Sequence, residues 1–170
     1  MTGLILAAGQ GRRMGQPKAT VVVDGQTLAW RTAAILLAAG LTRVVVALRE
    51  LQPLPEGAEA FLVPDPDGEA IDTIRQTQSF IGGGPIALLP VDCPDVQVAT
   101  VQTLLAAYRP PFTKPTFDGK GGHPVMFDLD LDGVASLRDA LHHAAGHFVA
   151  VPDPGILHNW NTPEAVRRAV

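Results

Sequence analysis

The chain has 170 residues, 46% of them hydrophobic, and its 17 acidic side chains outnumber its 13 lysines and arginines, which gives a formal net charge of −4. Chains of this length usually form one domain of roughly 100 to 200 residues, so we expect residues 1–170 to form a single domain. With this charge the chain offers no broad basic surface to neutralise nucleic-acid phosphates, so we expect no nucleic-acid partner.

A single cysteine, Cys93, leaves no partner for an internal disulfide and fits a reducing compartment, which favours the cytoplasm. The longest apolar stretch, Leu28–Leu41, contains Arg31 and is shorter than the roughly 20 residues that cross a bilayer, so it indicates a helix. The apolar N-terminus lacks the cationic start of a signal peptide. We therefore expect neither export nor a membrane partner.

Short apolar runs alternate with longer helix-like segments, which is typical of an α/β fold with a mostly parallel sheet covered on both faces. We expect strands at Leu4–Ala8, Arg43–Leu48, Ala60–Val63, Ile86–Val91, Val125–Phe127 and Phe148–Val151. We expect helices at Thr27–Ala39, which Gly40 ends, and at Glu69–Phe80, Val98–Tyr108, Val134–Ala145 and briefly after Pro163. The segments Gln52–Gly57 and Arg109–Pro115 are expected to be surface connections.

The most informative segment follows the first strand, where residues 6–18 read LAAGQGRRMGQPK. Glycines at Gly9, Gly11 and Gly15 allow backbone N–H groups to converge on phosphate oxygens, because glycine accepts a positive φ and has no side chain to hold a ligand away. Arg13 and Lys18 can neutralise a triphosphate. The segment therefore predicts a polyphosphate-binding loop.

Two other interpretations of this loop remain. It is an ordinary structural turn, or it is the dinucleotide fingerprint G-x-G-x-x-G with one residue too many, which would make the protein a nicotinamide or flavin oxidoreductase. Against the second, Pro17 would interrupt the helix that should begin here. The acidic ribose partner expected about 20 residues beyond the glycines is also missing, since the second strand runs on to Leu48.

Residues 6–18 closely resemble the signature L-A-A-G-x-S-x-R-M-G-x-x-K of the molybdopterin nucleotidyltransferase-like family of sugar-nucleotide and cofactor nucleotidyltransferases, with Gly11 in place of Ser. The resemblance continues through DGQTL at residues 24–28, which looks like the family's turn into its first helix. It implies a Rossmann-like domain of the nucleotide-diphospho-sugar transferase type. It also implies contacts to the base and ribose from Leu6, Ala7, Ala8 and Gly9, and to the phosphates from Arg13 and Lys18.

A carboxylate follows the strand Ile86–Val91 in the sequence LPVDCPD at residues 89–95. Open α/β sheets bind ligands at such strand ends, and Mg²⁺ prefers oxygen ligands together with substrate phosphates. The sequence resembles the family's G-D-M-P element, whose aspartate binds the metal, and this implies that Asp92 is an Mg²⁺ ligand. The alternative is a helix cap, for which Asp95 is better placed.

A second candidate ligand comes from NWNTPE at residues 159–164, which resembles the family's D-I-D-T-P-E-D with both aspartates replaced by Asn159 and Asn161. An amide oxygen coordinates Mg²⁺ without a negative charge, so we expect weaker metal binding. Related sugar-phosphate uridylyltransferases are similar in having Asn at the second metal position, which keeps Asn161 a candidate. Alternatively, Asn161 or Thr162 caps the last helix, and the two roles are compatible.

Two further segments resemble the family more loosely. By resemblance Asp65, in the turn at residues 64–68, and Thr73, in the helix that follows, lie near the base and ribose, although turn chemistry and a helical hydroxyl explain them equally well. The segment GGHPVMF at residues 121–127 resembles the G-H-P-V-L-F element of the cofactor cytidylyltransferases. It implies that His123 faces the acceptor; the alternative is a solvent-exposed histidine on a glycine-rich rim.

Two features complicate the acceptor side. The G-D-x-G-A-R loop of the cytidylyltransferase branch is absent, which weakens the case for a pterin acceptor. His143 and His147 have helical i, i+4 spacing and could bind a transition metal, but Gly146 interrupts the helix and no third ligand is evident.

We therefore expect an Mg²⁺-dependent nucleotidyltransferase that transfers a nucleoside monophosphate from CTP or GTP to a small phosphorylated acceptor, such as the molybdopterin cofactor, and releases pyrophosphate. CMP is favoured, because the guanylyltransferases of this family typically resemble L-A-G-G where this chain has Ala8, whose methyl group takes space beside the base. The alternatives are a guanylyltransferase of molybdopterin guanine dinucleotide synthesis, a nucleotide-binding oxidoreductase, and a protein that binds the nucleotide without turnover.

Overall fold

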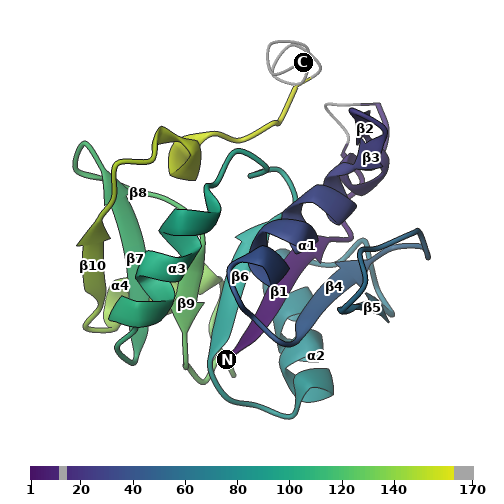
Figure 1. The fold of residues 1–170 in the computed structure, drawn as a ribbon. Helices are drawn as coiled ribbons and strands as arrows, with labels where there is room; N and C mark the ends of the chain where they lie inside the picture. The colour runs from purple at the N-terminus through teal and green to yellow at the C-terminus, as the bar shows by residue number, and fades with distance from the viewer. Residues whose placement is uncertain (12–14, 163–170) are drawn as a thin grey trace.

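The computed structural model describes residues 1–11 and 15–162, and their core is a mostly parallel β-sheet (Figure 1). The strand order is β10-β7-β9-β6-β1-β4-β5, with β8 paired to β7, and a separate two-stranded sheet joins β2 and β3. β1, β4, β5 and β6 run parallel to one another, whereas β9 is antiparallel to β6 and β7. The predicted α/β class with a mostly parallel sheet is confirmed.

The elements in chain order are β1 (Thr2–Ala7), η1 (Lys18–Thr20), β2 (Val22–Val23), β3 (Gln26–Thr27), α1 (Leu28–Ala38), β4 (Val44–Leu48), β5 (Ala58–Leu62), α2 (Ala70–Ile81), β6 (Ile86–Pro90), α3 (Val98–Ala107), β7 (Phe112–Phe117), β8 (Lys120–Gly121), β9 (Val125–Phe127), α4 (Leu137–His143), β10 (His147–Ala150) and η2 (Pro154–Leu157).

The central strands are buried on both faces because helices cover both sides of the sheet. All five residues of β4 have no exposed surface, which explains their uninterrupted apolar sequence VVVAL. One face packs on α1 and α3, as Leu36 and Leu104 show, and the other packs on α2 and α4, as Ile74 and Leu141 show (Figure 1). The described helices are too short or too polar to cross a bilayer.

Helix α1 has the ends that its sequence predicts. The Thr27 hydroxyl accepts a hydrogen bond from the Trp30 N–H at 3.2 Å and so caps the first turn. Gly40 ends the helix with φ of 103°, a conformation that other residues rarely adopt. The chain then enters β4 with its buried side chains in register with those of β1.

Two predicted boundaries are wrong. The segment Arg109–Pro115 is not merely a connection, because it includes the start of β7, a strand inside the sheet. Its prolines argue against a strand, since proline has no N–H to donate. Pro115 nevertheless pairs through its carbonyl, which accepts from the Gly122 N–H at 3.0 Å. The helix expected at Val134–Ala145 spans only Leu137–His143, because Ser136 caps it and His147 begins β10. The helix expected after Pro163 lies outside the described residues.

A buried carboxylate fixes the start of α3. Asp153 is 1% exposed and accepts hydrogen bonds from the Gln97 N–H at 2.9 Å, the Thr100 hydroxyl at 2.7 Å and the Gly155 N–H at 2.9 Å. Gln97, at the N-cap position, makes no side-chain capping bond of its own. Asp153 therefore caps α3 from a distant part of the chain and ties η2 to it.

We expect Asp153→Ala to lower the free energy of unfolding by about 3 kcal/mol, because three donors lose their acceptor in a buried site. Urea denaturation of the variant would measure the change. Asp132→Ala, at an exposed aspartate, is the matched control and should stay within about 0.5 kcal/mol of the wild type. Equal stability of the two variants would contradict the capping role.

Candidate active site

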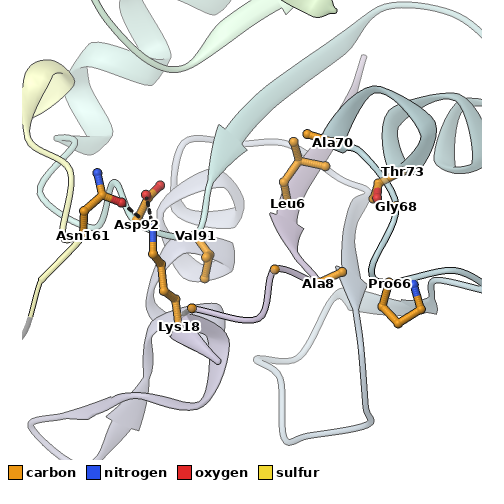
Figure 2. Close-up of a pocket in the computed structure, with 12 residues that line it drawn as sticks. Leu6, Ala8, Lys18, Pro66, Gly68, Ala70, Thr73, Val91, Asp92 and Asn161 are labelled. Atoms are coloured by element: carbon orange, nitrogen blue, oxygen red, sulfur yellow. Dashed lines mark hydrogen bonds and ion pairs between the residues drawn. The ribbon is translucent and has the colours of Figure 1, made fainter. Parts of the chain in front are cut away.

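A cavity of about 390 Å³ opens at the carboxyl ends of β1 and β6, where open α/β sheets bind their ligands (Figure 2). Its volume lies within the range of about 300 to 1,000 Å³ that is usual for small-molecule sites. The lining residues are Leu6, Ala8, Gly9, Gly11, Lys18, Pro66, Gly68, Ala70, Thr73, Val91, Asp92 and Asn161. Figure 2 shows a polar end, formed by Lys18, Asp92 and Asn161, and a loop end between β1 and the start of α2.

Three segments that are distant in sequence meet at the polar end. The Lys18 ammonium donates to Asp92 Oδ2 at 2.8 Å and also to Asn161 Oδ1 (Figure 2). The side chains of Lys18 and Asp92 are 22% and 16% exposed, so the ion pair is partly shielded from water. A carboxylate oxygen and an amide oxygen thus converge on one cationic group, as expected for residues that share a charged ligand.

The first loop closes tightly on itself at Gly11. This residue has φ of +61°, and a Cβ there would lie 2.0 Å from the Gln16 carbonyl oxygen. The serine of the family signature therefore does not fit this loop conformation. Gly9 has open space where its side chain would be and lines the cavity, so ligand atoms can approach its backbone. Arg13 lies outside the described residues, and its phosphate contact stays a prediction.

An arginine that the sequence analysis did not single out joins the two loops at the loop end. Arg49 donates from Nε to the Ala8 carbonyl at 3.3 Å and from Nη2 to the Pro66 carbonyl at 3.1 Å, and it also pairs with Asp67. Gln10 donates to the same Asp67 carboxylate. Arg49 directly follows β4, and this position at the carboxyl edge of the sheet is the signal that could have identified it.

Of the residues predicted near the base and ribose, some line the cavity and others do not. Thr73, on α2, is 7% exposed and lines the cavity together with Leu6. Asp65 is not among the lining residues, and its Oδ1 accepts from the Asp67 N–H at 3.2 Å, which shapes the turn. The Ala7 side chain packs into the core on the α1 side of the sheet, and Ala7 is not among the residues that line the cavity.

The segment after β10, residues 151–162, crosses the edge of the sheet and brings Asn161 to the polar end (Figure 1); we call it the C-terminal arm. Trp160 is 4% exposed, donates its backbone N–H to the Asp92 carbonyl at 2.8 Å, and donates its indole N–H to Asp95 Oδ2 at 2.8 Å. Asp95 also contacts His158 Nδ1 at 3.2 Å. Asp95 thus holds the arm and does not cap α3.

Asn159 is part of the same attachment. The buried Cys93 thiol donates to Asn159 Oδ1 at 3.2 Å. Burial raises the pKa of Cys93, and the neighbouring Asp92 raises it further, so the thiol keeps the proton that it donates. Asn159 therefore contacts protein at its amide oxygen, whereas the amide oxygen of Asn161 points into the site.

His123 lies in the segment just before β9, and part of its ring is buried. Its backbone N–H donates to the Ile156 carbonyl at 3.0 Å, and its ring nitrogen Nδ1 is buried without a hydrogen-bond partner. Burial, assisted by the positive charge of Lys114, lowers the pKa of His123 to about 4 although Asp92 opposes the shift, so the ring is neutral at pH 7. The alternative of a solvent-exposed rim histidine is wrong.

The other predicted histidine arrangement does not form. His143 ends α4, whereas His147 begins β10, so the two are not on one helical face. Within residues 1–11 and 15–162, no group of three His, Cys, Asp or Glu side chains is placed to hold a metal ion. A site built from Asp92 and Asn161 would need oxygen ligands from the substrate as well.

A family model described as the MobA-like NTP transferase domain matches residues 3–152. The chain belongs to this family. It is 31% identical to a probable molybdenum cofactor guanylyltransferase of Opitutus terrae, over 96% of this chain and 92% of the relative. A protein of the same name from Trichormus variabilis is 28% identical, over 96% and 87% of the two chains. The fold matches Rv0371c of Mycobacterium tuberculosis with a TM-score of 0.81 at 20% identity, over 98% and 95% of the chains.

The family prediction is therefore confirmed, and this MobA-like chain is a nucleotidyltransferase whose substrates are a nucleoside triphosphate and a small acceptor. The cytidylyltransferase branch is not specifically supported, since both of these relatives are named as guanylyltransferases. The oxidoreductase alternative finds no support in these matches.

We expect Trp160→Phe to lower the free energy of unfolding by about 1 kcal/mol, the typical contribution of one hydrogen bond, because the indole N–H to Asp95 is lost. Pyrophosphate release should also slow, since Asn161 is the next residue along the arm. Chemical denaturation and a turnover assay measure the two effects. Trp30→Phe, at a half-buried tryptophan of α1, is the matched control. Identical behaviour of the two variants would contradict the positioning role of Trp160.

Proposed function

We propose that this chain transfers GMP from GTP to the phosphate of a molybdenum cofactor acceptor. The structural observation that carries the proposal is the convergence of Lys18, Asp92 and Asn161 at the polar end of the cavity. The choice of donor and acceptor rests on the relatives, three of which are named as probable molybdenum cofactor guanylyltransferases. The reducing environment of the cytoplasm, where we propose that the reaction occurs, suits the free, buried thiol of Cys93.

The reaction is a displacement at phosphorus. An oxygen of the acceptor phosphate forms a bond to the α-phosphorus of GTP while the bond from that phosphorus to the β-phosphate oxygen breaks, and pyrophosphate leaves. The acceptor is already an anion, so no general base is needed. Catalysis therefore depends on positioning and on neutralising charge. Lys18 supplies a positive charge for the phosphates, and Arg13 is proposed to supply a second.

The polar end also fits a magnesium ion. Asp92 and Asn161 present a carboxylate and an amide oxygen to one cation, the Lys18 ammonium, and such oxygens are the ligands that Mg²⁺ prefers. We propose that these two residues would hold Mg²⁺ together with the substrate phosphates. Bound there, the ion would withdraw electron density from the α-phosphate.

The methyl group of Ala8 is a weaker obstacle to guanine than the sequence suggests. Ala8 is 6% exposed and belongs to the buried cluster that contains Leu4, Ala47 and Val63, so much of its surface packs into the core. The backbone carbonyl of Ala8 is held by Arg49, which fixes the loop that borders the cavity. On this proposal, the shape of the loop end matters more for base choice than the single methyl group.

We expect kcat/KM for GTP to exceed that for CTP by about tenfold or more, measured as pyrophosphate release with Mg²⁺ and the cofactor acceptor. Ala8→Gly should leave the GTP to CTP ratio within about twofold, because its methyl group is committed mainly to the core. Higher activity with CTP would favour CMP transfer instead. Nucleotide binding without any pyrophosphate release would indicate a binding protein.

We expect Asp92→Ala to abolish Mg²⁺-dependent turnover, and Asn161→Asp to lower the Mg²⁺ concentration for half-maximal activity because it adds a negative charge. Titration of Mg²⁺ at saturating GTP measures both. Asp132→Ala is the control, since this aspartate is exposed and is not among the cavity residues. Identical activation curves for the wild type and Asn161→Asp would remove Asn161 from the metal site.

A further inference from the structure

The third strand from the cavity, β7, carries a half-buried lysine, Lys114. Lys114 is on β7, and its side chain runs across Gly121 of β8, where an added Cβ would lie 2.9 Å from Lys114 Cε and 3.4 Å from Nζ. In the described part of the chain, no carboxylate oxygen comes within 4.0 Å of its ammonium. A partly buried charge of this kind is costly unless something neutralises it.

Two further groups surround Lys114. Arg138 is an exposed residue of α4, and its neighbour Leu137 packs in the same cluster as Phe112 of β7. Burial lowers the pKa of Lys114, and the charge of Arg138 lowers it further. His123 comes from the segment before β9, the strand that pairs with β7. The Gly122 N–H donates to the Pro115 carbonyl at 3.0 Å, which brings the backbone beside His123 next to that of Lys114, and the charges of both Lys114 and Asp92 act on the His123 pKa.

The hydrogen-bonding state of His123 suits an anion. Because Nδ1 is buried without a partner, a proton on Nδ1 would be a buried donor without an acceptor, whereas a proton on Nε2 is available to a ligand. We therefore assign the neutral ring a proton on Nε2. The three groups then offer two positive charges and one N–H donor, and none of the three lines the nucleotide cavity.

We propose that Lys114, Arg138 and His123 form a subsite for a phosphate monoester. A dianion matches the two positive charges, and its oxygens can accept from the His123 N–H and the Lys114 ammonium. The subsite deepens the proposed function, on which it rests: its phosphate is the acceptor group that attacks GTP. Neutralising this phosphate next to Asp92 would reduce its repulsion from the triphosphate and so help the two reactants to approach.

The test follows the ring signal of His123 by NMR in the full chain at constant pH and ionic strength, with the signal assigned by its loss in His123→Gln. Inorganic phosphate and glycerol 3-phosphate are titrated separately. We expect both ligands to shift the signal to saturation. Lys114→Met should bind each of them about tenfold more weakly, because it loses one charge-assisted hydrogen bond. Lys120→Met removes an exposed lysine of β8 and is the matched control.

Lys114→Met keeps the length of the side chain and removes an unpaired charge, so we expect it to fold, and its melting temperature verifies this. Arg138→Gln changes only an exposed residue and should also weaken binding, while Lys114→Arg should retain it. Equal affinity in Lys114→Met and the wild type would overturn the proposal, as would a shift that sodium chloride reproduces.

If inorganic phosphate binds but glycerol 3-phosphate does not, the acceptor role is overturned, because an acceptor phosphate carries a substituent. The titration uses neither GTP nor turnover. Absence of phosphate binding at the subsite would therefore not contradict GMP transfer. Absence of GMP transfer in a turnover assay would not change the NMR result.

Discussion

The contact of the Lys18 ammonium with Asp92 and Asn161 is the interaction on which the rest of the site depends. It joins residues that are 74 and 143 positions apart from Lys18 in the chain, so it exists only when the sheet and the C-terminal arm are both in place. The residues that carry these two oxygens are both attached to Trp160. The Asp92 backbone follows β6 and accepts from Trp160, and Asn161 extends from that same tryptophan. The positions of the Asp92 carboxylate and the Asn161 amide therefore depend on how Trp160 is held.

Aspartates support this arrangement through hydrogen bonds to distant partners. Asp153 ties the arm to the start of α3, Asp95 holds the Trp160 indole, and Asp67 joins Arg49 at the opposite end of the cavity. Each carboxylate thereby joins two segments that are distant in the chain. The cavity thus has polar groups at both ends and apolar side chains such as Leu6 and Val91 between them, a lining that is usual for small-molecule sites.

Much of the fold and site could be predicted from sequence because the signals are local. Apolar runs mark β1, β4 and β6, and the short segments around Lys18, Asp92 and Asn161 carry recognisable motifs. β7 was missed because Pro110, Pro111 and Pro115 disguise it, although two of the strands that pair with it, β8 and β9, follow it closely in the chain. Arg49 and Lys114 were missed for a different reason: each gains meaning only from residues on other elements. The effect of Ala8 could not be judged, since its packing depends on Val63 and Ala47.

The arm also orders events during protein synthesis. The N-terminal segments carrying Lys18 and Asp92 leave the ribosome first, whereas Trp160 and Asn161 follow the last strand, β10. A nascent chain that ends at β10 still lacks one of the two oxygens that converge on Lys18. Vectorial translation therefore delays completion of the polar end of the cavity until the sheet that supports it has been made.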